Sequence, residues 1–135
     1  MNKKVIVPVV LVLIVIVSSM FLIARGSPSS KNVATNAPVK EFKMTSFTEM
    51  VNGEPKPHFS LNEIVVNKGD KVRIKITETS GMHNFVIDEF GVYKDTPLNQ
   101  ESVVEFIADK SGNFVYYCSK PGHRQNGQWG TLRVL

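Results

Sequence analysis

Apolar and polar residues alternate along much of the chain after residue 40, with a period of two rather than the longer period of a helix. The clearest case is Lys71–Thr77, in which Val72, Ile74 and Ile76 share one face. Further short segments bounded by turn residues lie at 42–47, 59–66, 85–87, 101–107, 113–118 and 130–135. About seven short strands without a convincing amphipathic helix predict an all-β fold, a Greek-key β-sandwich, over residues 41–135.

The segment 113–118 places chemistry on one of these strands. Its period of two puts Phe114, Tyr116 and Cys118 on the same inward face. Cys118 is the only cysteine of the chain, which excludes an intrachain disulfide. The sulfur of Cys118 is therefore predicted to enter the interior at the start of a loop that joins two strands.

The N-terminal segment has a different pattern. Lys3 and Lys4 precede an apolar run over residues 5–24, about the length that crosses a bilayer as a helix. Residues 1–25 are therefore expected to form a membrane anchor or signal segment, with an uncleaved transmembrane helix favoured because the apolar run continues past the small-residue site. The lysines would remain cytoplasmic, which places the rest of the chain at the periplasmic or extracellular face.

Residues 26–40 are small, polar and proline-containing, which predicts a flexible linker before a domain at 41–135. The net charge of +4 misrepresents that domain. Residues 1–40 hold five basic residues and no acidic residue, which leaves a net charge of −1 for residues 41–135. Nothing in this balance favours a nucleic-acid partner, and we expect a monomeric domain.

The loop after Cys118 carries a candidate metal site. His123 follows five positions later and Gln128 five positions after that, with turn-forming residues between them. A soft thiolate and an imidazole at short spacing favour copper, and a second, upstream histidine would complete a trigonal His2Cys set with a weak axial ligand. His83 is the upstream candidate. A lone thiol outside the cytoplasm would also be oxidised unless it were buried or bound to metal, which independently points to Cys118 as a ligand.

Other interpretations of these residues are less favoured. Cys118 could be an inert buried thiol. A nucleophile paired with His123 is a second alternative, but an inward cysteine suits this role poorly. A structural zinc site is a third, but such sites usually need more than one sulfur ligand. A binuclear copper centre would need a second loop cysteine. Gln128 could also be a simple loop residue that leaves the copper three-coordinate. Gln125 and Met82 are the weaker axial candidates, and the third histidine, His58, is expected at the surface.

The four candidates occur in the order that characterises one protein family. His83, Cys118, His123 and Gln128 resemble the ligands of the cupredoxin (blue copper protein) family, over residues 41–135. The Cys-x4-His-x4-Gln spacing resembles the stellacyanin-type loop, whereas the more usual axial residue is methionine. The sequence around His83 and Cys118 is more similar to that of small membrane-anchored bacterial and archaeal cupredoxins. The chain also lacks the disulfide of plant stellacyanins.

This resemblance implies one copper ion that cycles between Cu(I) and Cu(II), held by two ring nitrogens, a thiolate and an amide oxygen. The harder amide oxygen would favour Cu(II) and lower the reduction potential relative to methionine. Asn84 is expected to bridge the two ligand segments. Phe85, Pro121 and Trp129 are expected to keep water from the metal.

The functional expectation is a one-electron carrier without enzymatic activity, tethered at the outer face of a membrane. It would exchange electrons with redox partner proteins through the edge of His123. A copper buffer or chaperone without electron transfer is the alternative. A red-copper or catalytic variant would need a carboxylate or an open position at the metal, and Asp88 and Glu89 are expected to lie away from it.

Overall fold

The computed structural model describes residues 39–135, which form nine β-strands and a short 3-10 helix. The elements are β1 (Val39–Val51), β2 (Glu54–Phe59), β3 (Glu63–Val66), β4 (Lys71–Glu78), β5 (His83–Ile87), η1 (Asp88–Phe90), β6 (Val92–Thr96), β7 (Glu101–Ile107), β8 (Gly112–Tyr117) and β9 (Trp129–Val134). The predicted membrane segment and all but the last two residues of the predicted linker lie outside the described residues. Within residues 39–135, none of the helical structure has the length and apolar character of a membrane span.

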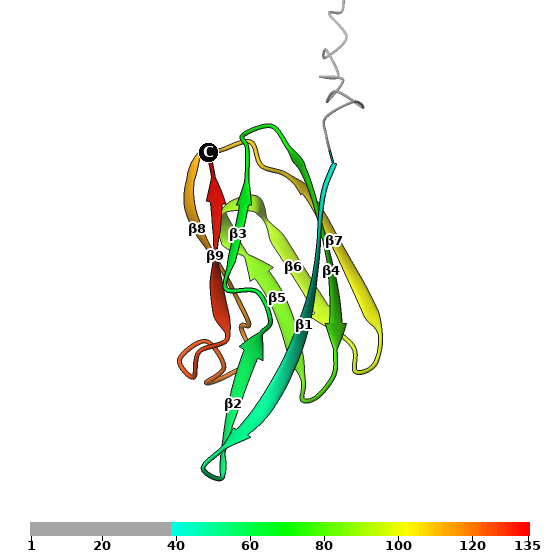
Figure 1. Cartoon of the computed structure of the whole chain (residues 1–135), viewed down its shortest axis with the longest axis vertical. Coiled ribbons are helices and arrows are strands. Elements are labelled where there is room, and N and C mark those ends of the chain that lie inside the picture. The colour runs from blue at the N-terminus through cyan, green and yellow to red at the C-terminus, as the bar shows by residue number, and fades with distance from the viewer. Residues whose placement is uncertain (1–38) are drawn as a thin grey trace, which may run out of the picture. The chain divides into compact units, whose positions relative to one another are not determined.

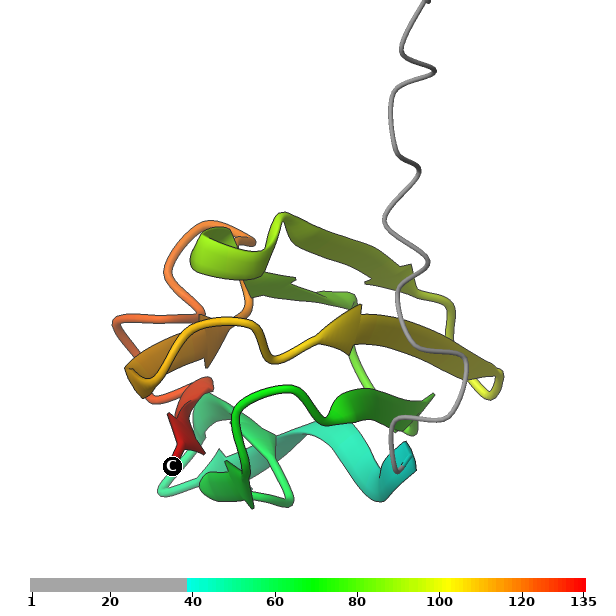
Figure 2. The same ribbon diagram turned by 90° about the horizontal axis from the view of Figure 1, so that it is seen from above.

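The strands form two mixed sheets, which confirms the predicted all-β sandwich. One sheet has the order β2-β1-β4-β7 and the other the order β3-β9-β8-β5-β6. The two layers can be followed in Figures 1 and 2. The pairs β1–β4 and β3–β9 are parallel and the other strand pairs are antiparallel.

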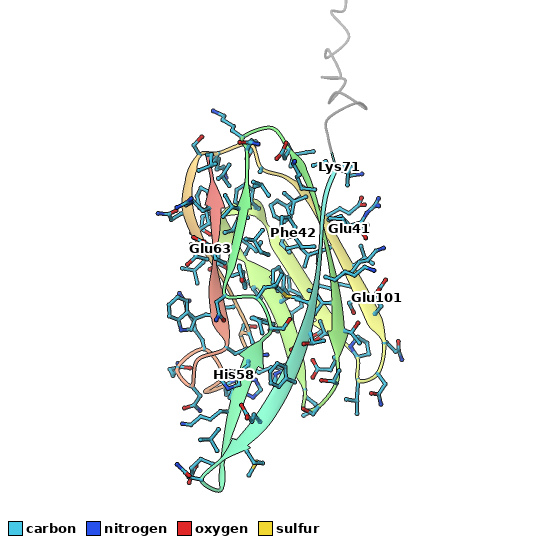
Figure 3. All side chains as sticks on the ribbon, viewed as in Figure 1. Glu41, Phe42, His58, Glu63, Lys71 and Glu101 are labelled. Carbon is cyan, nitrogen blue, oxygen red and sulfur yellow. The ribbon has the colours of Figure 1, made fainter. Side chains whose placement is uncertain are left out.

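The alternation along β4 places apolar residues inside and charged residues outside, as the sequence predicts. Val72, Ile74 and Ile76 are fully buried, while the side chains between them lie on the outer face. On this outer face, Lys71 forms an ion pair of 3.0 Å with Glu105. A second ion pair of the same length connects β4 to Glu41 on β1. Figure 3 shows Glu41, the acidic partner on β1, and Lys71 at this face. Such exposed pairs contribute little stability, so the buried face holds the sheet in place.

The centre of the sandwich is an aromatic cluster. Phe85 stacks on Tyr116 with ring centroids 5.4 Å apart, and Phe59 meets both rings from the opposite sheet. The Tyr116 hydroxyl donates a hydrogen bond of 2.7 Å to the carbonyl of Leu61. The Cα of Gly130, on β9, faces this ring so closely that an added Cβ would lie 2.3 Å from the tyrosine Cζ. The cluster therefore fits only because β9 has no side chain at that point.

Three details differ from the pattern-based expectation. The segment 59–66 is not one strand, because the chain crosses between the sheets after Phe59, and β3 begins only at Glu63. The expected break at 52–57 is a tight hairpin, in which Asn52 and Gly53 both have positive φ and the following prolines lie on an edge strand. The strand β6 was not predicted, because its middle residues are all exposed and polar or aromatic.

Candidate metal centre

The site lies at the end of the sandwich where the β8–β9 loop and the tip of the β1–β2 hairpin are found, away from the C-terminus (Figure 1). Cys118 directly follows β8 and Gln128 directly precedes β9. The amide of Cys118 donates to the carbonyl of Gln128 at 3.1 Å, which closes the loop at its base. His123 lies at the middle of the loop, and its carbonyl accepts the amides of Asn126 and Gln128 at 3.1 and 3.0 Å. The loop is therefore fixed by its own backbone.

Four predicted donor atoms meet at this point. Ligand atoms of His83, Cys118 and His123 all lie within 4.8 Å of one another. The His123 Nδ1 is 3.0 Å from the Nδ1 of His83, 3.5 Å from the sulfur of Cys118 and 3.1 Å from the Oε1 of Gln128. Two imidazole nitrogens, one sulfur and one amide oxygen are the donor set of a His2Cys copper site with a weak oxygen ligand. The residues present thus fit a copper ion.

The ring of His83 is held with Nδ1 toward this point. Its Nε2 lies 2.9 Å from the carbonyl of Ser80, an acceptor, so Nε2 carries the proton and Nδ1 presents a lone pair. The hydroxyl of Thr48 lies 3.2 Å from the same nitrogen. Burial lowers the pKa of His83, which favours the neutral, ligating form. A Cβ at Gly81 would lie 2.6 Å from Nε2, so glycine is required for this approach.

Gln128 is oriented by contacts behind its amide group. Its Nε2 donates to the hydroxyl of Ser46 at 2.9 Å and to the carbonyl of His58 at 3.3 Å. Both acceptors occupy the amide nitrogen and leave Oε1 to face the donor cluster. Gln128 is fully buried, whereas Met82, an axial alternative, is 79% exposed. Gln125, the other alternative, is exposed on the loop.

Cys118 is fully buried, and burial raises the pKa of its thiol. A neutral thiol that solvent does not reach is a poor nucleophile, which argues against covalent catalysis with His123. A metal ion reverses this balance, because a coordinated thiol loses its proton. The environment of Cys118 therefore suits a ligand better than a reactive thiol.

Asn84 links the two segments that carry the ligands, in the bridging position the sequence predicts. It is almost fully buried beside His83. Its Oδ1 accepts the amide of Ser119 at 2.8 Å, and its Nδ2 donates to the Ser119 hydroxyl at 2.8 Å and to the Tyr93 hydroxyl at 3.2 Å. The residue after the cysteine is thus tied to β5.

Replacement of Asn84 by Ala is expected to lower the free energy of unfolding of the copper-free protein by about 1–3 kcal/mol, because the Ser119 amide loses its side-chain acceptor. Urea unfolding followed by circular dichroism measures this change. Asn113→Ala, at an exposed position of β8, is the matched control and should leave stability within about 0.5 kcal/mol. Equal effects of the two substitutions would contradict the bridging role.

The expected shield around the site is only partly seen. Phe85 is fully buried in the core, but Trp129 is 49% exposed and Pro121 is exposed as well. His123 is partly exposed, unlike the other three predicted ligands. Trp129 and Pro121 therefore form part of the outer surface near the loop. His58 is half-exposed on β2 (Figure 3), and only its backbone carbonyl reaches the site.

Glu78 was not among the predicted site residues. It is fully buried, and its carboxyl group lies 3.4 Å from the Nε2 of His83. The alternation that puts Val72, Ile74 and Ile76 inside continues to Glu78 when the strand is extended by one residue beyond Thr77. Desolvation raises the pKa of this carboxyl group. This continued alternation, which places a glutamate on the buried face of the strand, is the sequence signal that could have identified Glu78.

A β-sandwich in which two histidines, a buried cysteine and a glutamine converge at one end presents a donor set that is compatible with copper. The model of the cupredoxin-like domain matches residues 12–132, and the chain belongs to this family. The four candidate ligands lie within the matched range.

Relatives of the chain include nitrous-oxide reductases. The chain is 37% identical to the enzyme of Stutzerimonas stutzeri over 67 residues, 47% of this chain and 10% of that protein. It is 30% identical to the enzyme of Cupriavidus necator over 119 residues, 85% of this chain and 17% of that protein. The chain therefore spans only a small part of the curated relatives it matches.

Solved structures agree on the fold. Reduced auracyanin from Roseiflexus castenholzii superposes with a TM-score of 0.58 at 18% identity, covering 73% of this chain and 99% of that chain. Copper nitrite reductase from Nitrosomonas europaea superposes with a TM-score of 0.62 at 17% identity, covering 71% of this chain and 41% of that chain.

Proposed function

We propose that this protein is a mononuclear copper protein that carries single electrons at the outer face of a membrane. The observation that carries the proposal is the convergence of His83, Cys118 and His123 donor atoms within 4.8 Å, with the amide oxygen of Gln128 held beside them. Copper in such a set supplies a one-electron couple between Cu(I) and Cu(II).

The surroundings suit electron transfer because the ligands are held before metal binding. His83 is fixed by the Ser80 carbonyl and Gln128 by the Ser46 hydroxyl. Ligands that need not move between oxidation states lower the reorganisation that accompanies electron transfer. His123 is the one predicted ligand with solvent-exposed surface, and it is proposed as the electron port toward a redox partner protein.

The membrane location rests on the sequence, through the apolar run at residues 5–24 and the linker after it. A tether of this kind would restrict the copper domain to a thin layer above the bilayer and shorten its search for partners. The proposed role is that of a carrier and not of an enzyme, with one copper ion for each chain.

The test is the visible and EPR spectra and the voltammetry of the purified, copper-loaded full-length chain. The carrier role predicts an intense thiolate-to-copper band near ~600 nm and a reversible one-electron couple. Copper that leaves under mild chelation, or a site without a reversible couple, would instead favour copper storage or delivery. Turnover of a small substrate by the loaded protein would contradict the non-enzymatic assignment.

The axial role of Gln128 has its own test. Gln128→Met should raise the reduction potential, because a thioether is softer than an amide oxygen and favours Cu(I). A tenfold gain in preference for Cu(I) over Cu(II) corresponds to about 59 mV for a one-electron couple, and we expect at least this shift in voltammetry. Gln125→Met, on the exposed part of the loop, is the control. An unchanged potential in Gln128→Met would remove Gln128 from the ligand set.

A further inference from the structure

Glu78 is a buried carboxylate that the fold alone does not explain. Its side chain is fully buried at the end of β4, and within residues 39–135 its Oε1 has no hydrogen-bond partner. The Nε2 of His83 lies 3.4 Å from this Oε1. A buried polar atom without a hydrogen-bond partner is unfavourable and needs an explanation. The position of Oε1 against the Nε2 edge of His83 points to a role at the metal centre.

The carboxylate is held in place at its other oxygen. Thr96, on β6, donates a hydrogen bond of 3.0 Å to Oε2. The backbone carbonyl of Glu78 accepts the amide of Asn99 at 2.8 Å, which fixes the strand end as well. Because these hydrogen bonds restrain both the side chain and the backbone of Glu78, they hold Oε1 against the Nε2 edge of His83.

The same part of the sandwich supports the axial residue. Ser46, which accepts the amide group of Gln128, lies directly opposite Glu78 in the parallel register of β1 and β4. One pair of neighbouring residues thus stands behind two of the predicted ligands, Glu78 behind His83 and Ser46 behind Gln128. Both are fully buried, so their influence on the site is not weakened by water.

We propose that Glu78 is a positioning residue for the copper site, whose carboxyl group lies against the Nε2 edge of His83 and favours the more highly charged Cu(II) state. This inference rests on the proposed copper function. The Ser80 carbonyl fixes the tautomer of His83, and a carboxyl group packed behind the same ring edge adds to its orientation and makes the ring a better donor. The negative charge of the Glu78 carboxylate also stabilises Cu(II) more than Cu(I), because Cu(II) carries one more positive charge.

The experiment compares Glu78→Gln with Glu101→Gln in the full-length chain. Both substitutions remove one negative charge and keep the side-chain shape, but Glu101 is exposed on β7 (Figure 3). Affinities for Cu(I) and Cu(II) are measured separately by competition with chelators. Glu78→Gln should lose about tenfold or more in Cu(II) affinity, with a smaller loss for Cu(I). Each tenfold difference between the two losses should raise the potential by about 59 mV.

The inference would be overturned if Glu78→Gln and Glu101→Gln had the same affinity for Cu(I) and the same affinity for Cu(II). A lower unfolding temperature of copper-free Glu78→Gln with an unchanged ratio of Cu(II) to Cu(I) affinity would also overturn it, because that result indicates a structural role only. If Glu78→Gln does not fold, Thr96→Val tests the inference instead. This substitution keeps the Glu78 carboxyl group but removes the hydrogen bond to its Oε2. The ratio of Cu(II) to Cu(I) affinity should then fall as in Glu78→Gln, but by less. An unshifted ratio in Thr96→Val would then overturn the inference. Failure of the proposed function is seen separately, as weak copper binding or a missing thiolate band in the wild-type chain.

Discussion

Cys118→Ser is expected to abolish the intense visible absorption of the copper-loaded protein and to weaken Cu(I) binding by several orders of magnitude. The band requires a copper–thiolate bond, and the chain has no other cysteine that could replace it. A serine hydroxyl is a hard and weakly acidic donor that a soft Cu(I) ion binds poorly. Absorption and EPR spectra after copper loading, with chelator competition for affinity, measure the result.

The copper-free Cys118→Ser protein should still fold, because the two side chains are similar in size. Burial of the hydroxyl is expected to cost about 1–3 kcal/mol. Ser111→Ala, in the exposed turn before β8, serves as the control and should keep both the band and the affinity. A blue Cys118→Ser protein would exclude the site described above.

Gly130→Ala is expected to destabilise the copper-free protein by about 3 kcal/mol, which is at the upper end for overpacking of a tight core. The added Cβ would lie 2.3 Å from the Cζ and Oη atoms of Tyr116. That ring cannot retreat, because Phe59 and Phe85 pack against it and its hydroxyl bonds the Leu61 carbonyl. Denaturant unfolding measures the loss.

A double-mutant cycle identifies the cause. Tyr116→Leu removes the atoms that the new methyl group would meet, so the combined variant should lose clearly less stability than the sum of the two single changes. Additive losses would show that the clash with Tyr116 is not the reason. Displacement of β9 should also loosen the loop that ends at Gln128, which predicts faster loss of copper from Gly130→Ala alone.

Much of this architecture follows from alternation within single strands. The inward faces of β4 and β8 could be predicted because the alternation of apolar and polar residues along a strand indicates which side is buried, as at Val72, Tyr116 and Cys118. The segment 59–66 is predicted as one strand because apolar residues recur in both of its halves, whereas distant partners decide the sheet to which each half belongs. The strand β6 escaped prediction because an exposed edge strand needs no apolar alternation.

The site was predictable to a similar extent. Spacing on one loop brought Cys118, His123 and Gln128 together as candidates, since neighbouring loop residues cannot lie far apart. The groups that orient them come from other strands. Ser46 and the His58 carbonyl reach Gln128 from β1 and β2, and Glu78 reaches His83 from the end of β4. Such contacts depend on register between strands, which local patterns do not encode.

The parallel pairing of β3 with β9 has a consequence for when the site forms. This pairing joins Glu63 to Thr131, residues far apart in the sequence, and β9 anchors the far end of the ligand loop. Contacts between such distant segments form slowly, because a long stretch of chain must be closed first. We therefore expect the donor atoms to converge after the last strand has docked, and copper uptake to follow folding.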